Sequence, residues 1–166
     1  LGLFLIMPVF TLYADELAGA TPVLIGMAIG AYGLTQALLQ IPMGVLSDRI
    51  GRRPVIVGGL LLFAAGSVLA ALSTAIWGVI LGRALQGAGA IAAAVMALAA
   101  DSTSDRQRTK AMALIGISVG VAFMLALIAA PLVAAAGGLA GIFWLSTGLA
   151  VLAMVLLFAL VPAPAV

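Results

Sequence analysis

The chain alternates between long apolar stretches and short polar turns. Most of the stretches are apolar on every face over about twenty positions, whereas strands of a membrane barrel alternate apolar and polar residues. The pattern therefore predicts an all-α transmembrane protein, a six-helix bundle with no strands. The six spans are expected at about residues 1–14, 22–46, 54–72, 76–100, 111–135 and 139–160.

Prolines and glycines indicate where these helices begin, bend and end. Pro22 suits the first position of the second span, and Pro8 is expected to kink the first span. Gly137 and Gly138 predict a turn between the fifth and sixth spans. The first stretch ends at Ala14 and would rise only about 21 Å, less than the roughly 30 Å of a bilayer core. We therefore expect the first helix to be truncated and to begin upstream of this sequence.

The composition excludes a water-soluble domain and several classes of chemistry. Apolar residues make up 66% of the chain and charged residues 7%, against about a quarter charged in soluble domains. The lipid bilayer is therefore an expected partner. The absence of Cys and His excludes thiolate and imidazole metal sites and hydrolysis by a Ser-His-Asp triad, and no Asp pair lies within a span. We predict neither an enzyme nor a bound metal or cofactor.

Basic residues lie mainly in two of the five connections, and they predict the orientation in the membrane. The net charge is +2, and its placement indicates topology rather than nucleic-acid binding. Short loops rich in Lys and Arg face the cytoplasm, so both connections and both ends of the chain are expected there. The residues concerned are Arg49, Arg52 and Arg53 in one connection and Arg106, Arg108 and Lys110 in the other.

The connection between the second and third spans has a specific pattern, G-x-L-x-D-R-x-G-R-R, which runs from Gly44 to Arg53. It places four of the twelve charges within six residues. Gly44 would permit the close approach of a neighbouring helix, and Gly51 would permit a tight turn. The ordinary interpretation of Asp48 is a charge at a helix end that is solvated among lipid headgroups.

This pattern closely resembles the signature loop of the major facilitator superfamily of secondary transporters. The resemblance implies a conformational latch, in which Asp48 favours the positive N-terminal end of a helix in the other half of a transporter. It further implies that Arg52 supports Asp48 and pairs with Asp101 at the end of the fourth span. The implied latch set is Gly44, Asp48, Arg49, Gly51, Arg52, Arg53 and Asp101.

Arg83 is the only charge deep within a span. A charge at the bilayer centre costs about 2.5–3.5 kcal/mol on insertion scales, so Arg83 is expected to face an internal cavity. Gln86 shares its helix face. The pattern R-x-x-Q-G-x-G resembles the fourth-helix motif of the same superfamily, in which the arginine is linked to proton coupling. The alternative is a structural arginine bonded to carbonyl oxygens. Its helix offers no acidic partner, so the partner must come from another span, which the sequence does not identify.

Two further groups of residues each allow two interpretations. Polar side chains at Tyr32, Gln36 and Gln40 form a stripe on the second span, which would either line a water-filled path or hydrogen-bond to neighbouring helices. Small residues at helix-packing spacing, Gly26 with Gly30, Gly78 with Gly82 and Gly116 with Gly120, favour close packing, with a hinge as the alternative. In the fifth span, Pro131 matches part of the G-P-x-x-G-G motif of proton antiporters, whereas the glycines of that motif are absent.

The resemblance covers the whole chain as the N-terminal six-helix half of a twelve-helix transporter. Within the superfamily, the loop and the stretch from Gly78 to Met96 resemble YajR-type proton-driven exporters of bacterial inner membranes. This implies alternating access and proton-coupled export of small molecules, lipophilic ones included. The implied partners are a small-molecule substrate, protons and an absent C-terminal half.

Two alternative functions stay open, an uptake carrier for a sugar or other small solute, and a structural membrane protein without transport. No carboxylate lies within a span. A proton-carrying acid is therefore expected beyond this sequence or at a membrane boundary, at Asp15 or Glu16. The sequence does not identify the substrate or the direction of transport.

Overall fold

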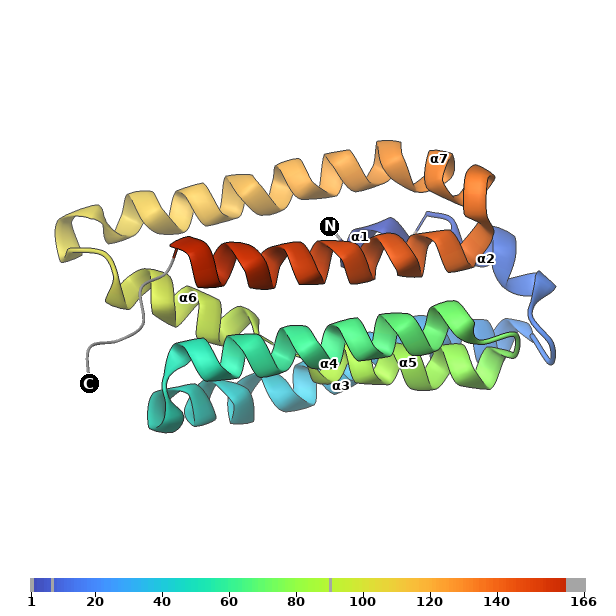
Figure 1. Cartoon of the computed structure of the whole chain (residues 1–166), viewed down its shortest axis with the longest axis horizontal. Helices are drawn as coiled ribbons and strands as arrows, with labels where there is room; N and C mark the ends of the chain where they lie inside the picture. The colour runs from blue at the N-terminus through green and yellow to red at the C-terminus, as the bar shows by residue number, and fades with distance from the viewer. Residues whose placement is uncertain (1, 7, 90, 161–166) are drawn as a thin grey trace.

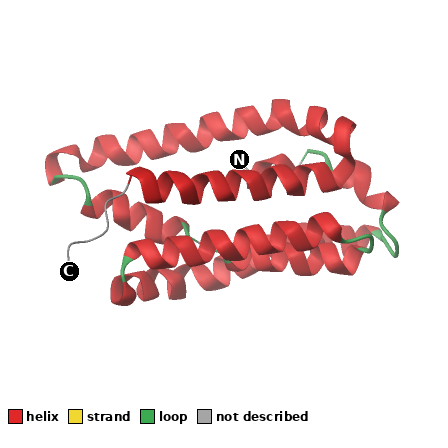
Figure 2. Cartoon of the chain, viewed as in Figure 1, coloured by secondary structure: helices red, strands yellow, loops and turns green. Residues whose placement is uncertain are grey.

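The apolar stretches form helices, because a backbone in lipid must satisfy its own hydrogen bonds. The computed structural model describes residues 2–6, 8–89 and 91–160, and within these ranges it contains helices and no strand (Figure 2). The longer helices run side by side in one bundle (Figure 1). In chain order the elements are α1 (Gly2–Ile6), α2 (Phe10–Tyr13), the 3-10 turn η1 (Ala14–Glu16), α3 (Pro22–Ile50), α4 (Arg52–Leu72), α5 (Ile76–Ala88), α6 (Ala92–Asp101) and α7 (Asp105–Leu160).

The segment of the predicted first span contains two short helices. α1 ends at Ile6 and α2 begins at Phe10, with Pro8 between them. A proline lacks the amide hydrogen that a continuous helix would need, which accounts for an interruption near this point. Leu1 and Met7, which the predicted span also included, lie outside the described residues.

The connection between α3 and α4 is much shorter than the sequence pattern suggests. The backbone of α3 continues four residues beyond the predicted end, and α4 begins two residues before the predicted start. Only Gly51 separates them, with φ of +98°, a conformation that L side chains rarely adopt. Asp48 and Arg49 therefore occupy the last turn of α3, and Arg52 and Arg53 occupy the first turn of α4.

The segment of the predicted fourth span forms two helices rather than one. α5 ends after Ala88, and α6 begins at Ala92. The amide of Gly89 bonds to the carbonyl oxygens of Leu85 and Gln86, which closes the last turn of α5. The backbone of α4 approaches closely here, because a Cβ atom at Gly89 would overlap the carbonyl oxygen of Gly59. Ala90 lies outside the described residues.

The last two predicted spans form α7, which reverses direction at the predicted glycine pair. Gly137 and Gly138 have non-helical backbone angles, and Gly138 has a φ of +59°. Figure 1 shows the second stretch of α7 returning beside the first. The first stretch continues helically through Pro131. α7 also begins at Asp105, six residues before the predicted fifth span, so the expected polar loop is largely helical.

Close contacts between small residues fix α5 against its two neighbours. A Cβ atom at Gly82 would lie 2.6 Å from the carbonyl oxygen of Gly66 in α4. A Cβ atom at Gly87 would overlap Thr35 Oγ1 and the carbonyl oxygen of Tyr32 in α3. These contacts hold the face of α5 that carries Arg83 between α3 and α4. The other expected packing glycines behave differently: Gly78 approaches Ser73 of the preceding turn, and the described residues leave open space around Gly26, Gly30, Gly116 and Gly120.

Many large apolar side chains remain on the surface, as lipid contact permits. The main core gathers apolar side chains from α1, α2, α3, α4, α5 and both stretches of α7, and Phe10 and Phe143 are its aromatic members. In the described part of the chain, four helical stretches are long and apolar enough to cross a membrane, at Pro22–Ile50, Arg52–Leu72, Ile76–Asp101 (which contains α5 and α6) and Asp105–Ala159. The last contains both the fifth and the sixth predicted spans, and the count of six crossings stays a prediction.

Candidate functional site

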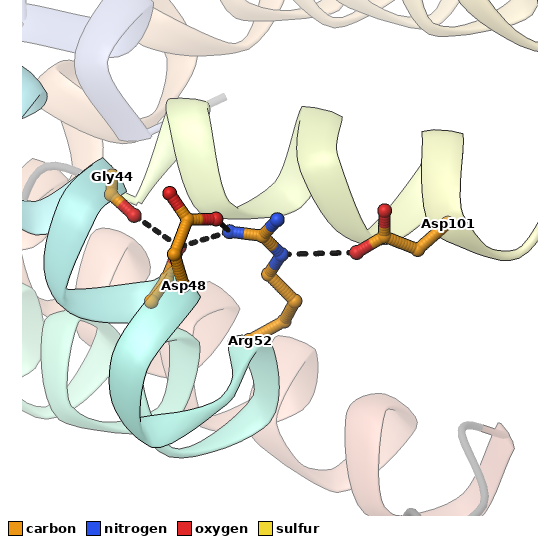
Figure 3. A network of polar contacts seen from close by, with 5 residues as sticks. Gly44, Asp48, Arg52 and Asp101 are labelled. Carbon is orange, nitrogen blue, oxygen red and sulfur yellow. Dashed lines mark hydrogen bonds and ion pairs between the residues drawn. The ribbon is translucent and has the colours of Figure 1, made fainter.

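Arg52 is the centre of a polar network that joins the ends of α3, α4 and α6 (Figure 3). Its guanidinium forms an ion pair with Asp48, one turn earlier, and its Nε atom lies 3.0 Å from Asp101 Oδ2. The structure thus brings together the three charged residues whose contact the motif implied. Asp101 is distant in sequence, so this pair fixes the end of α6 beside the junction of α3 and α4.

Ser47 belongs to the same network and was missed in the sequence. Its Oγ atom accepts a hydrogen bond from Arg52 Nη1 at 2.7 Å and donates one to the carbonyl oxygen of Gly44, also at 2.7 Å. Ser47 is buried. The available signal was a small hydroxyl residue beside Asp48 at the end of an apolar helix. Gly44 also approaches α6 as expected, since a Cβ atom there would lie 3.4 Å from Ala93 Cβ.

Solvent exposure limits how strongly this network can stabilise the fold. The side chains of Asp48 and Asp101 are 60% and 59% exposed, whereas that of Arg52 is 22% exposed. Exposed ion pairs contribute about 0.2–1 kcal/mol each. The network therefore consists of weak, partly exposed contacts.

The other two arginines of the motif do not join the Arg52 network. Arg53 turns toward the end of α7, where its guanidinium lies 4.9 Å from the centre of the Phe158 ring. Its Nη2 atom donates a hydrogen bond to the Phe158 carbonyl oxygen at 3.5 Å. Arg49 is exposed on the last turn of α3. The expected latch set therefore divides into an ion-paired centre and two arginines outside it.

Arg83 lies in a buried polar cluster within the bundle. It is 2% exposed, and its Nη1 atom donates to Gln86 Oε1 at 2.7 Å. Gln86 Nε2 in turn donates to Ser67 Oγ in α4, also at 2.7 Å. Ser67 donates to the carbonyl oxygen of Phe63 one turn earlier, which ends this chain of hydrogen bonds.

The structure identifies a partner for Arg83 that the sequence could not name. The guanidinium carbon of Arg83 lies 4.5 Å from the centre of the Tyr32 ring in α3. A desolvated contact of this kind contributes about 2 kcal/mol or more. No carboxylate of the described residues forms an ion pair with Arg83. Its positive charge is therefore stabilised by an aromatic face and an amide oxygen, two groups that carry no net charge.

A cavity of about 500 Å³ lies beside this cluster. Tyr32 and Gln36 line it, so one residue both contacts Arg83 and faces the cavity. Ser146 in the second stretch of α7 adds a third polar lining residue that was not expected from the sequence. The rest of the lining is apolar and comes from α4, α6, both stretches of α7 and the break between α5 and α6, including Phe63, Ile91, Val95, Met96, Val119 and Ala153.

Some of the expected site residues lie apart from both polar clusters and from the cavity. Gln40 follows Gln36 on the stripe but is not part of the cavity lining. Pro131, Gly116 and Gly120 lie on the exposed side of the first stretch of α7. The acidic turn that contains Glu16 follows α2, at the end of the bundle away from Arg52 (Figure 1). Among the described residues, no three acidic side chains gather to hold a metal ion.

Comparison with known proteins gives similarities along the whole chain. A family model described as Major Facilitator Superfamily matches residues 1–166. The inner membrane transport protein YajR of Escherichia coli K12 is 58% identical over 98% of this chain. An uncharacterized transporter of Buchnera aphidicola from Schizaphis graminum is 40% identical over 98% of the chain, and the class B tetracycline resistance protein of Escherichia coli is 37% identical over 85%.

These relatives are much longer than the present chain. The matched region spans 36% of YajR, 41% of the Buchnera protein and 34% of the tetracycline resistance protein. Their names describe transporters or a drug-resistance protein rather than enzymes. This agrees with the prediction that the chain is not an enzyme.

Proposed function

Because the chain belongs to the Major Facilitator Superfamily, we propose that it forms one six-helix half of a proton-coupled exporter of small lipophilic molecules. The second half would be supplied by the same polypeptide, in keeping with the greater length of the relatives. The two halves would alternate between states that open the central cavity to opposite sides of the membrane. The basic ends of α3, α4 and α7 would face the cytoplasm.

The cavity beside Arg83 is the observation that carries this proposal. A volume of about 500 Å³ lies within the range of small-molecule sites. Among the described lining residues, hydrogen-bonding side chains occur only at Tyr32, Gln36 and Ser146. A sugar would need many more polar partners, so this wall favours export of lipophilic compounds over uptake of a sugar. The name of the tetracycline resistance protein supports the same choice.

The buried Arg83 supports coupling to protons. Its charge has no ion-pair partner among the described residues, so a carboxylate that approaches and loses its proton would gain a strong interaction. We place that carboxylate in the remaining part of the full-length transporter. Tyr32 contacts Arg83 and also lines the cavity, so a change in charge beside Arg83 would affect the cavity wall through Tyr32.

The Arg52 network supports alternating access. In the present state Arg52 holds Asp48 and Asp101 together across three helices. Asp48 is well exposed and could instead approach the N-terminal end of a helix in the second half. We propose that the network stabilises one state of the transporter and opens in the other.

Cysteine labelling would test alternating access without knowledge of the substrate. The chain contains no Cys, so a single cysteine can be placed at Val119 in the cavity wall, in a full-length transporter that lacks other cysteines. In proteoliposomes, a membrane-impermeant maleimide should modify V119C at a rate that changes when a proton gradient is imposed. Leu132→Cys, on the exposed face of the same helix, is the matched control and should show no such change.

If the labelling rate of V119C is independent of the proton gradient, the cavity does not take part in proton-driven alternation. The alternative function, a structural membrane protein without transport, would then be preferred. Arg83→Ala provides a second readout, because it should abolish the gradient dependence of V119C while the protein still accumulates. Retention of that dependence would exclude Arg83 from coupling.

A further inference from the structure

A second hollow lies on the outside of the bundle, away from the central cavity. It has a volume of about 640 Å³ and lies between the first turns of α4 and the end of α7. Its polar end is lined by Arg52 and Arg53, and the remainder is lined by Ile50, Gly51, Pro54, Val57, Gly58, Leu61 and Phe158. Transport as proposed above makes no use of this hollow.

Arg53 is the charged group of this hollow that lacks a counter-ion. Arg52, which also lines it, forms ion pairs with Asp48 and Asp101. No described carboxylate pairs with Arg53, and its Nε atom is buried without a hydrogen-bond partner in the described part of the chain. Its remaining contacts are the Phe158 ring and the long hydrogen bond to the Phe158 carbonyl oxygen. An anionic group in the hollow would supply the missing counter-ion through the outer guanidinium nitrogens, since the buried Nε atom lies out of its reach.

The remaining wall of the hollow is apolar and open to the surroundings. Leu61 is 53% exposed and Phe158 is 58% exposed. Gly58 adds no side chain, and a Cβ atom built there would meet nothing within 4 Å. Leu61 follows Arg53 by eight positions, which corresponds to a rise of about 12 Å along α4. The hollow thus combines a cation at the polar end of the helix with an apolar slot that extends toward the bilayer core.

We propose that this hollow binds an anionic phospholipid of the leaflet next to the basic end of the bundle. The phosphate would pair with the Arg53 guanidinium, and one acyl chain would lie along Leu61 and Phe158. Arginine binds phosphate well because its planar donors match two phosphate oxygens at once. A zwitterionic lipid would bring its own ammonium group near Arg52 and Arg53, so a headgroup with net negative charge is favoured. Basic pockets between membrane helices recognise lipid headgroups in this way.

Native mass spectrometry of the full-length transporter would test this site. The protein is equilibrated with mixed micelles that contain equal amounts of phosphatidylglycerol and phosphatidylcholine, and retained lipids are counted. The wild-type protein should retain phosphatidylglycerol in preference to phosphatidylcholine. Arg53→Gln should reduce that preference about fivefold, the effect expected for one basic residue at a membrane surface. Arg106→Gln, an exposed basic residue at the start of α7, should leave it unchanged.

A second variant tests the apolar part of the hollow while the charge of Arg53 is unchanged. Gly58→Leu fills the hollow without altering any charged residue, so it should reduce retention of both lipids. It also provides the test if Arg53→Gln does not fold, as judged by size-exclusion chromatography. Wild-type preference in Arg53→Gln, or wild-type retention of both lipids in Gly58→Leu, would overturn the proposal.

Discussion

Replacement of Gln86 by Leu would test whether the buried cluster around Arg83 depends on one amide. Gln86 accepts a hydrogen bond from Arg83 and donates one to Ser67, so it joins α5 to α4. Leucine has a similar volume but offers neither group. The variant would leave a buried guanidinium without its amide acceptor, while Tyr32 would continue to cover one face of it.

The two lost hydrogen bonds set the expected magnitude. A hydrogen bond to a charged group contributes about 1.5–3 kcal/mol, and a hydrogen bond between membrane helices contributes about 0.6 kcal/mol on average. We expect Gln86→Leu to lower the free energy of unfolding by about 2–4 kcal/mol. Ser67→Ala removes only the second bond and should lower it by about 0.6–1 kcal/mol.

The assay is unfolding of the full-length protein in bicelles with increasing sodium dodecyl sulfate, followed by tryptophan fluorescence. Gln36→Leu makes the same chemical change at a cavity-lining residue outside the cluster and should stay within about 0.5 kcal/mol of wild type. The double variant of Ser67 and Gln86 should be less destabilised than the sum of the single variants, since both remove one shared bond. If Gln86→Leu and Gln36→Leu have equal effects, the cluster does not stabilise the bundle as argued.

Three further predictions concern the ends, contacts and turn of the helices. Arg52→Ala should lower the free energy of unfolding by about 1 kcal/mol, because it breaks two partly exposed ion pairs, and Arg49→Ala should have little effect in the same detergent titration. Gly87→Leu should prevent α5 from packing on α3 and reduce the yield of monodisperse protein in size-exclusion chromatography, whereas Gly148→Leu, with open space around it, should not. Gly138→Ala should lower the thermal unfolding midpoint, since its backbone angles (φ +59°, ψ −156°) cost a residue with a side chain about 1–3 kcal/mol; an unchanged midpoint would mean that the turn adopts other angles.

The helices, the start of α3 and the turns could be predicted from the sequence, because each depends on residues that are close together in the chain. The helices follow from apolar stretches that must satisfy their backbone bonds in lipid. Pro22 begins α3, and the chain turns at Gly51 and at Gly138, because these residues restrict or permit particular backbone angles locally. The contact of Arg52 with Asp101 was predicted through the family resemblance, and the structure contains it.

Helix ends were predicted less accurately because hydropathy does not define them. Charged residues ended the predicted second span at 46, yet α3 continues to Ile50 because a helix can carry charges in its last turn. The interruption after Ala88 was also missed. It depends on the approach of the α4 backbone at Gly59, a contact that the pattern within one helix does not contain.

The sequence by itself determined that the chain is helical, that it belongs in a membrane, and that Arg83 needs a partner. Only the tertiary structure decided which groups surround each charge. Tyr32 covers Arg83 because Gly87 lets α5 approach α3, and Arg53 faces Phe158 because the end of α7 returns beside α4. The physical reason is that hydropathy and turn chemistry act within one helix, whereas the environment of a buried charge is set by side chains from other helices.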